Sequence, residues 1–117
     1  MDPIQTNLSH LNQLVLEGKA LEAFEMYYDD NVVMQENELA PTVGKGANRK
    51  REIESYKNII EFRGAEVLKT AVNYDISFVM WKYDFTHKEW GVRNYTQVSV
   101  QHWKDGKIIR EQFFYNS

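Results

Sequence analysis

A chain of 117 residues with 43% hydrophobic and 26% charged residues is long enough for one domain with its own core, so we expect a single domain over residues 1–117. A formal net charge of −3 argues against general nucleic-acid binding, and no apolar run has the length of a membrane span or the pattern of a signal peptide. The absence of cysteine excludes disulfides and thiolate chemistry and agrees with the cytoplasm, where we expect the protein.

The first part of the chain predicts two helices. Asp2 followed by Pro3 is a typical helix start, and Gly18 marks the end of this helix. Apolar side chains recur through it at helical spacing: Ile4, Leu8, Leu11 and Val15. A second helix begins near Ala20 and ends at the polar residues 29–31. Both helices therefore have one apolar face for a core.

A short strand over residues 32–36 is followed by a predicted loop over residues 37–46. The residues that break regular structure in this loop are Pro41, Gly44 and Gly46. A third helix is predicted over residues 47–62, and Gly64 ends it. The side chains expected to face inward from this helix are Ile53, Tyr56, Ile60 and, less clearly, Ile59.

The second half of the chain is rich in β-branched and aromatic residues and predicts four strands. Their expected ranges are 65–73, 76–86, 90–103 and 107–115. Asp105 and Gly106, between the last two strands, form one of the strongest hairpin signals, because glycine tolerates the positive φ of a tight turn. Helices first and antiparallel strands afterwards predict an α+β fold, not the alternation of a parallel sheet.

The last strand has large apolar groups on both of its faces. Strict alternation places Ile109, Glu111, Phe113 and Tyr115 on one face. It places Ile108, Arg110, Gln112 and Phe114 on the other. A carboxylate among apolar neighbours lies at a pocket mouth, has a partner or has a shifted pKa. Because neither face is polar, we expect one to contact the helices and the other a second subunit.

This order of elements resembles the NTF2-like superfamily, and more narrowly a SnoaL-like domain of the bacterial type. The resemblance rests on the runs Tyr-Asp-Asp-Asn-Val-Val at 28–33 and Asp-Gly-Lys-Ile-Ile at 105–109, and it covers nearly the whole chain. It implies a cone-shaped fold, in which three N-terminal helices and a strongly curved antiparallel or mixed sheet enclose an apolar pocket for a small organic molecule. It also implies a homodimer contact on the outer face of the sheet. It names no single activity, because the superfamily includes several kinds of enzyme and many non-catalytic binders.

The resemblance does not extend to ketosteroid isomerase chemistry. The general base of that enzyme falls on Gln35, which cannot take up a proton at neutral pH. Its oxyanion-hole tyrosine falls on Leu11, and its oxyanion-hole acid falls near Val100. In contrast, the pocket-facing positions of its last strand match three residues of this chain: Glu111, Phe113 and Tyr115.

Glu111 is the candidate catalytic acid or base, with Glu36 as a candidate second carboxylate. A carboxyl group in an apolar cavity has a raised pKa and exchanges protons near neutrality. The structural alternative is a hydrogen bond from Glu111 to Tyr56 or Gln97. Arg49, near the start of a helix, opposes the helix dipole, so Glu36, Glu38 or an anionic ligand should offset its charge. The alternative for Arg49 is a surface salt bridge.

The side chains expected to bind the ligand are Gln35, Arg49, Tyr56, Gln97, Trp103, Phe113 and Tyr115. Core filling explains most of the aromatic ones equally well. The 3 histidines lack metal-ligand spacing, so we expect neither a metal nor a cofactor. An enzyme of this kind would isomerise, cyclise, dehydrate or hydrolyse a small molecule. The alternative is a non-catalytic ligand-binding or dimerisation module, which a cavity plugged by Trp103, Tyr115 and Met34 would favour.

Overall fold

The computed structural model describes residues 3–116, so the predicted helix start at Asp2 lies outside the described residues. The elements are α1 (Pro3–Leu16), α2 (Ala20–Tyr27), β1 (Tyr28–Glu36), β2 (Thr42–Val43), α3 (Lys45–Lys57), β3 (Ile59–Asn73), β4 (Ile76–His87), β5 (Gly91–Lys104) and β6 (Lys107–Phe114). The strands form a six-stranded sheet in the order β2-β1-β6-β5-β4-β3. Strand β1 pairs with β6 in parallel, and the remaining neighbours are antiparallel.

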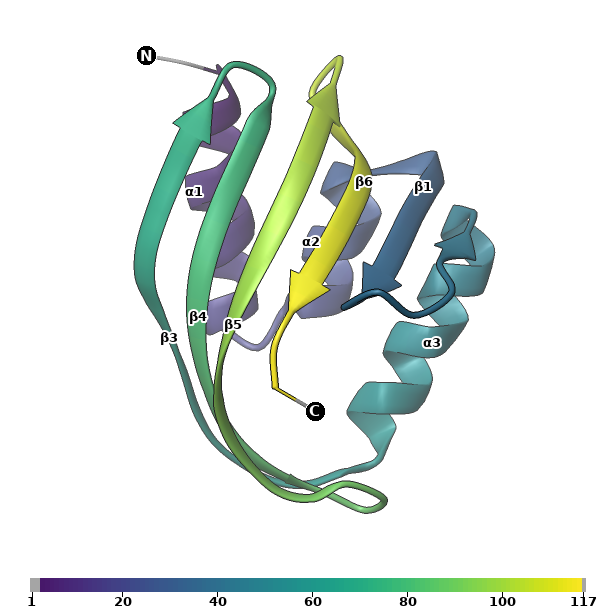
Figure 1. The fold of residues 1–117 in the computed structure, drawn as a ribbon, viewed down its shortest axis with the longest axis vertical. Helices are drawn as coiled ribbons and strands as arrows, with labels where there is room; N and C mark the ends of the chain where they lie inside the picture. Colours follow the sequence, from purple (N-terminus) through teal and green to yellow (C-terminus); the bar gives the residue numbers. More distant parts are fainter. Residues whose placement is uncertain (1–2, 117) are drawn as a thin grey trace.

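The helices and the sheet enclose the core from two sides. Figure 1 shows α1 and α2 against one face of the sheet, while the lower halves of β3, β4 and β5 bend toward α3. The buried apolar side chains come mainly from α1, α2 and the inward positions of the strands: Leu8, Leu11, Leu14, Phe24, Val79, Trp81 and Ile108. This arrangement confirms the predicted α+β fold, with three helices on a curved mixed sheet.

The turn between β5 and β6 has the predicted geometry. Asp105 and Gly106 both have positive φ angles, 52° and 78°, as a tight two-residue hairpin requires. Lys104 and Lys107 pair directly on either side of the turn. The dipeptide therefore sets where the last strand begins.

The predicted helix over residues 47–62 is wrong at both ends. Helix α3 begins at Lys45 and ends at Lys57, and residues 59–64 belong to β3. Phe62 pairs with Phe85 of β4, and Ile60 is 69% exposed rather than turned inward. β-Branched and aromatic side chains favour a strand, and pairing with the long neighbouring strand outweighs the helical spacing of the apolar residues.

Strand β1 is longer than predicted, because it begins at Tyr28, immediately after α2. The polar run 29–31 follows the end of α2, as predicted, but lies within the strand, where the pairing with β6 is irregular between Tyr28 and Val33. The predicted loop over residues 37–46 also contains the two-residue strand β2.

Strict alternation on β6 fails at a β-bulge. Arg110 pairs with His102, whereas Ile108 pairs with the next residue of β5, Trp103, so Ile109 is the extra residue. Ile108 is therefore fully buried and Ile109 is 37% exposed, the reverse of what alternation predicted. Beyond the bulge the inward positions are those expected, and Glu111 is 2% exposed.

Asn48 fixes α3 to the edge of the sheet. Its Nδ2 lies 3.3 Å from the carbonyl oxygen of Val32, 3.0 Å from that of Thr42 and 2.8 Å from that of Gly44. The side chain is 1% exposed, and its contacts join the first turn of α3 to β1 and β2. This anchor positions the helix wall of the candidate site.

Candidate functional site

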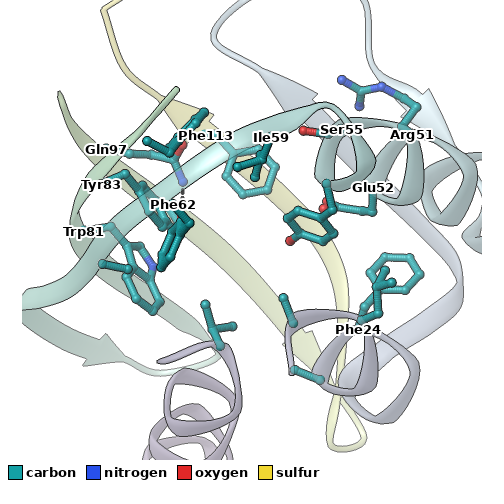
Figure 2. A pocket seen from close by; sticks show the side chains of 18 of the residues that line it. Phe24, Arg51, Glu52, Ser55, Ile59, Phe62, Trp81, Tyr83, Gln97 and Phe113 are labelled. Atoms are coloured by element: carbon teal, nitrogen blue, oxygen red, sulfur yellow. Dashed lines mark hydrogen bonds between the residues drawn. The ribbon is translucent and has the colours of Figure 1, made fainter. Parts of the chain in front are cut away.

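A cavity of about 1360 Å³ lies between the helices and the concave face of the sheet. This volume exceeds the roughly 300–1,000 Å³ of an ordinary small-molecule pocket. In Figure 2, Phe24 of α2 and Glu52 of α3 lie across the cavity from Trp81 and Tyr83 of β4, whereas Arg51 is directed away from them. The wall is therefore aromatic on the sheet side and carries a carboxyl group on the helix side.

Glu111 lies in this wall, and each of its oxygens accepts a hydrogen bond. The Tyr28 hydroxyl donates to Oε1, and Gln101 Nε2 donates to Oε2 at 2.8 Å. Burial raises the pKa of Glu111 to about 7, although both hydrogen bonds act to lower it. The nearby charges of Glu52 and Glu36 raise this pKa further. Glu111 is thus a buried carboxyl group that titrates near neutrality.

A chain of buried hydrogen bonds lies beneath Glu111. Trp103 Nε1 donates to Ser77 Oγ at 2.8 Å, and Ser77 Oγ donates to Gln101 Oε1 at 2.6 Å. Trp103 was predicted to bind ligand, but it is 3% exposed and packs in the core instead of lining the cavity. Trp103 points inward from β5 and hydrogen-bonds to Ser77. Ser77 in turn hydrogen-bonds to Gln101, so Trp103 contacts the cavity wall only indirectly.

Glu52 is a further carboxyl group of the site, and it was not predicted from the sequence. Burial raises the pKa of Glu52, the Tyr56 hydroxyl lowers it, and the charge of Glu36 raises it. Tyr56 lies four residues further along the helix, on the same face, so this spacing was the available signal. Burial also raises the pKa of Tyr56 well above its usual range, although 41% of the surface of the residue as a whole is exposed to solvent.

Glu36 and Tyr115 lie together in the cavity wall. The Tyr115 hydroxyl donates to Glu36 Oε1 at 3.0 Å. Burial, and next the charge of Glu36, raise the pKa of Tyr115 to about 12. The ring of Tyr95 lies 5.5 Å from that of Tyr115, and the Arg93 guanidinium lies 4.5 Å from the Tyr95 centroid. This part of the cavity is therefore a tyrosine cluster with one carboxylate and one cation.

Besides Trp103, two more predicted ligand-binding residues lie outside the cavity. Gln35 donates to the Leu39 carbonyl oxygen at 2.8 Å and accepts from Arg110 Nη2 at 2.9 Å. The alternation of β1 turns Gln35 outward and Glu36 inward, which corrects the prediction for Gln35.

Arg49 is the second correction. It pairs with Glu25 of α2, and its Nη2 lies 2.8 Å from Glu25 Oε1. The acid that offsets the cations at the start of α3 is therefore Glu25, because the first turn of α3 contacts α2 rather than the cavity. This is the surface pair that the sequence left as the alternative.

The remaining predicted site residues line the cavity: Glu36, Tyr56, Gln97, Glu111, Phe113 and Tyr115. Gln97 donates to Ser99 Oγ at 3.2 Å, whereas Glu111 is held by Tyr28 and Gln101, which were not predicted as its partners. The structure thus brings together the two predicted carboxylates and adds a third, Glu52.

Within residues 3–116, no group of three or more His, Asp or Glu side chains is placed to hold a metal ion. In the same part of the chain, no helix is both long enough and apolar enough to cross a membrane.

A family profile described as a SnoaL-like domain matches residues 5–115. The chain belongs to the SnoaL-like domain family. This match confirms the family that the sequence resembled, and it covers both the helices and the sheet of this SnoaL-like domain. No curated protein matches the sequence.

Solved structures share the fold of this SnoaL-like domain. A Mesorhizobium loti protein described as a SnoaL-like polyketide cyclase and also as a carbohydrate phosphatase is 28% identical, with a TM-score of 0.87, covering 98% of this chain and 100% of that one. A Bacillus subtilis protein described as an isomerase is 20% identical, with a TM-score of 0.77, covering 99% and 90%. An NTF-2-like protein from Burkholderia xenovorans is 16% identical, with a TM-score of 0.78, covering 98% and 84%.

Proposed function

We propose that this SnoaL-like domain is a small-molecule enzyme in which Glu111 exchanges a proton with an organic molecule bound in the cavity. The observation that carries the proposal is the Glu111 carboxyl group itself, buried in the wall of an open cavity with its pKa raised to about 7. A group with a pKa near the working pH both accepts and releases protons efficiently. Glu52 and Glu36 assist, because their charges raise this pKa.

The step that suits Glu111 is removal of a proton from a carbon next to a carbonyl group. Isomerisation and cyclisation of carbonyl compounds both begin this way. Burial raises the pKa of Tyr83, in the cavity wall, well above its usual range, so its hydroxyl stays protonated and can donate to an oxygen that gains negative charge. The relative described as a polyketide cyclase supports a carbonyl-bearing substrate.

The test is exchange of α-protons in deuterated water, followed by proton NMR with cyclohexanone and 2-cyclohexenone as probes. The wild-type protein should accelerate exchange over buffer between pH 6 and 9, and Glu111→Gln should remove the acceleration. Glu38→Gln, at an exposed position outside the cavity, is the control and should behave as wild type. Exchange by Glu111→Gln at the wild-type rate would reject Glu111 as the proton carrier.

The alternative function is a non-catalytic binding or dimerisation module. A cavity plugged by Trp103, Tyr115 and Met34 would favour this alternative. Trp103 and Met34 pack in the core, and Tyr115 forms part of the wall, so these contacts support an open site for a small molecule.

A homodimer through the outer face of the sheet is the second part of the proposal. Phe78, Met80 and Phe114 are 37%, 36% and 39% exposed on that face. Met80 pairs with Val98, which in turn pairs with Phe114, so the apolar side chains are contiguous across three strands. Monomers rarely expose such a patch. Ile108 was expected in this patch, but the bulge turns it into the core.

A further inference from the structure

We propose that Tyr28 is the residue through which Glu111 exchanges its proton with the ligand, and that Gln101, held by Ser77 and Trp103, restricts this exchange to Glu111 Oε1. The inference rests on the proposed acid–base function. It assigns a catalytic role to Tyr28 and a positioning role to three residues deeper in the wall.

The hydrogen bonds under Glu111 have a fixed direction. The indole N–H of Trp103 can only donate, so Ser77 Oγ accepts from it at 2.8 Å. The Ser77 hydroxyl hydrogen then points to Gln101 Oε1 at 2.6 Å. This bond holds the amide oxygen of Gln101 toward Ser77 and its NH₂ group toward Glu111. If the Gln101 amide were rotated by 180°, its NH₂ group would face the Ser77 hydroxyl. That hydroxyl already donates its hydrogen toward Gln101, so two donors would face each other.

The locked amide decides where a proton can sit on Glu111. Oε2 faces the Gln101 NH₂ group at 2.8 Å, and an amide N–H cannot accept a hydrogen bond. A proton on Oε2 would therefore point at another donor. Oε1 faces the Tyr28 hydroxyl, which can either donate or accept a hydrogen bond. Protonated Glu111 thus carries its hydrogen on Oε1 and donates it to Tyr28.

Tyr28 is placed to connect this oxygen with the ligand. Its side chain belongs to the cavity wall and also donates to Glu111. Burial, and next the charge of Glu111, raise the pKa of Tyr28 well above its usual range. The Tyr28 hydroxyl therefore does not ionise. It can give its proton to Glu111 only if it receives another proton from the ligand at the same time.

The transfer balances in both directions. The C–H bond of the ligand breaks and its proton forms a new O–H bond on Tyr28, while the original Tyr28 hydrogen moves to Glu111 Oε1. The electron pair stays on the ligand as an enolate, and the charge of Glu111 is neutralised. Reversing the two movements returns a proton to the ligand at a different carbon, which is an isomerisation.

Several other ionisable groups influence Glu111. Glu36 lies on β1, and Glu52 lies on α3. Tyr56 of α3 and Tyr83 of β4 lie near enough that the charge of Glu111 raises the pKa of each. None of these four groups donates to Oε1 in place of Tyr28. Because the charge of Glu52 also raises the pKa of Tyr28, the comparison with Glu111→Gln is needed to assign a pH response of Tyr28 to Glu111.

The first test needs no activity. Tyrosine labelled with ¹³C at Cζ should show the Tyr28 signal shifting with a midpoint near the Glu111 pKa of about 7, because the hydroxyl changes from donor to acceptor there. The shift should vanish in Glu111→Gln. A Tyr28 signal that stays constant from pH 5 to 9 while Glu111 titrates would overturn the relay.

The second test uses Tyr28→Phe in the α-proton exchange assay at pH 9. The substitution removes a donor from the carboxylate, which makes Glu111 a stronger base, so a purely structural Tyr28 would leave exchange equal or faster. The relay predicts a loss of roughly 100-fold or more. Tyr27→Phe is the matched control: its hydroxyl contacts His10 outside the cavity, so exchange should remain at the wild-type rate.

The outcomes separate the relay from the proposed function. Wild-type exchange at pH 9 that Glu111→Gln abolishes and Tyr28→Phe preserves would leave Glu111 as the proton carrier and overturn the relay. Absence of exchange in the wild type would contradict the proposed function, and the ¹³C titration would still decide whether Tyr28 and Glu111 share the proton.

Discussion

Ile108 and Glu111, three residues apart on β6, face the same side of the sheet. In a regular strand, residues three apart point to opposite sides. The bulge at Ile109 shifts the alternation of the strand by one residue, so Ile108 packs in the core while Glu111 lies in the cavity wall. One extra residue thus allows an apolar anchor and a functional carboxyl group to share a face.

The bulge is tested by a matched pair of truncations. Ile108→Ala should lower the free energy of unfolding by about 2–5 kcal/mol, because it leaves a cavity at a fully buried site. Ile109→Ala, at a 37% exposed site, should cost less than about 1 kcal/mol. Urea unfolding measures both. If Ile109→Ala lowered the free energy of unfolding more than Ile108→Ala, the strand would alternate strictly, with Ile108 on the outer face, and the bulge would be contradicted.

Glu111 should make the protein less stable as the pH rises. Its pKa is about 7 in the folded state against 4.5 for the free group, so the folded state binds the additional proton between these values. The stability present below pH 4.5 is therefore lost progressively up to about pH 7. At pH 8, Glu111→Gln should be more stable than wild type by about 1–3 kcal/mol, because it removes the buried charge.

The measurement is the difference in unfolding free energy between Glu111→Gln and wild type, taken from pH 4.5 to 8. The difference should grow with pH, and Glu38→Gln should show no such trend. A difference that stays constant over this range would show that Glu111 titrates at an ordinary pKa, which would remove the main support for its proposed role.

Gln101→Leu should raise the pKa of Glu111 further. Leucine keeps the volume but removes the N–H donor that favours the charged carboxylate. The Ser77 hydroxyl also loses its acceptor, so the free energy of unfolding should fall by about 1–3 kcal/mol. Carboxyl ¹³C NMR gives the titration. Thr96→Val, at an exposed position of the same strand, is the control; an unchanged Glu111 midpoint in Gln101→Leu would contradict the assigned bond.

Met80→Lys should separate the proposed homodimer. Met80 lies between Val98 and the outer side of β3 in the centre of the apolar patch, where a buried ammonium group would be unpaired. Sedimentation should show wild type at twice the chain mass of 13.9 kDa and the variant at the single-chain mass. Glu38→Lys, on the loop after β1, should remain dimeric. Wild type that sediments as a single chain at micromolar concentration would disprove the dimer.

Local signals in the sequence were enough for much of the fold. Asp105 and Gly106 fixed the last hairpin, since their turn type depends only on adjacent residues. Residues 59–64 show the limit of such signals, because the spacing of their apolar residues fits a helix. They form a strand instead, because β3 pairs with all twelve residues of β4. Pairing of this kind depends on residues that lie far away in the sequence.

The same limit applies to the candidate site: the sequence indicates residues with a local signal and does not indicate their distant partners. Glu111 stands out in the sequence because a charged residue interrupts an apolar strand. Its partner Tyr28 lies 83 positions away, and nothing local marks the pair. Glu52 sits on a helix so rich in charged residues that its inward face has no apolar stripe to reveal it. The sequence around Arg49 suits the cavity and the surface equally, because its partner Glu25 lies on a different helix, α2.

The parallel pairing of β1 with β6 also has a consequence for how the chain folds. It joins segments far apart in the sequence, such as those of Tyr28 and Glu111, which are 83 positions apart, and contacts at such separations form slowly because a long loop must close first. The α1–α2 pair and the β3–β4–β5 meander can assemble through nearby contacts, before β6 docks against β1. Because Glu111 lies on β6 and Tyr28 on β1, the hydrogen bond between them forms only in this last docking step.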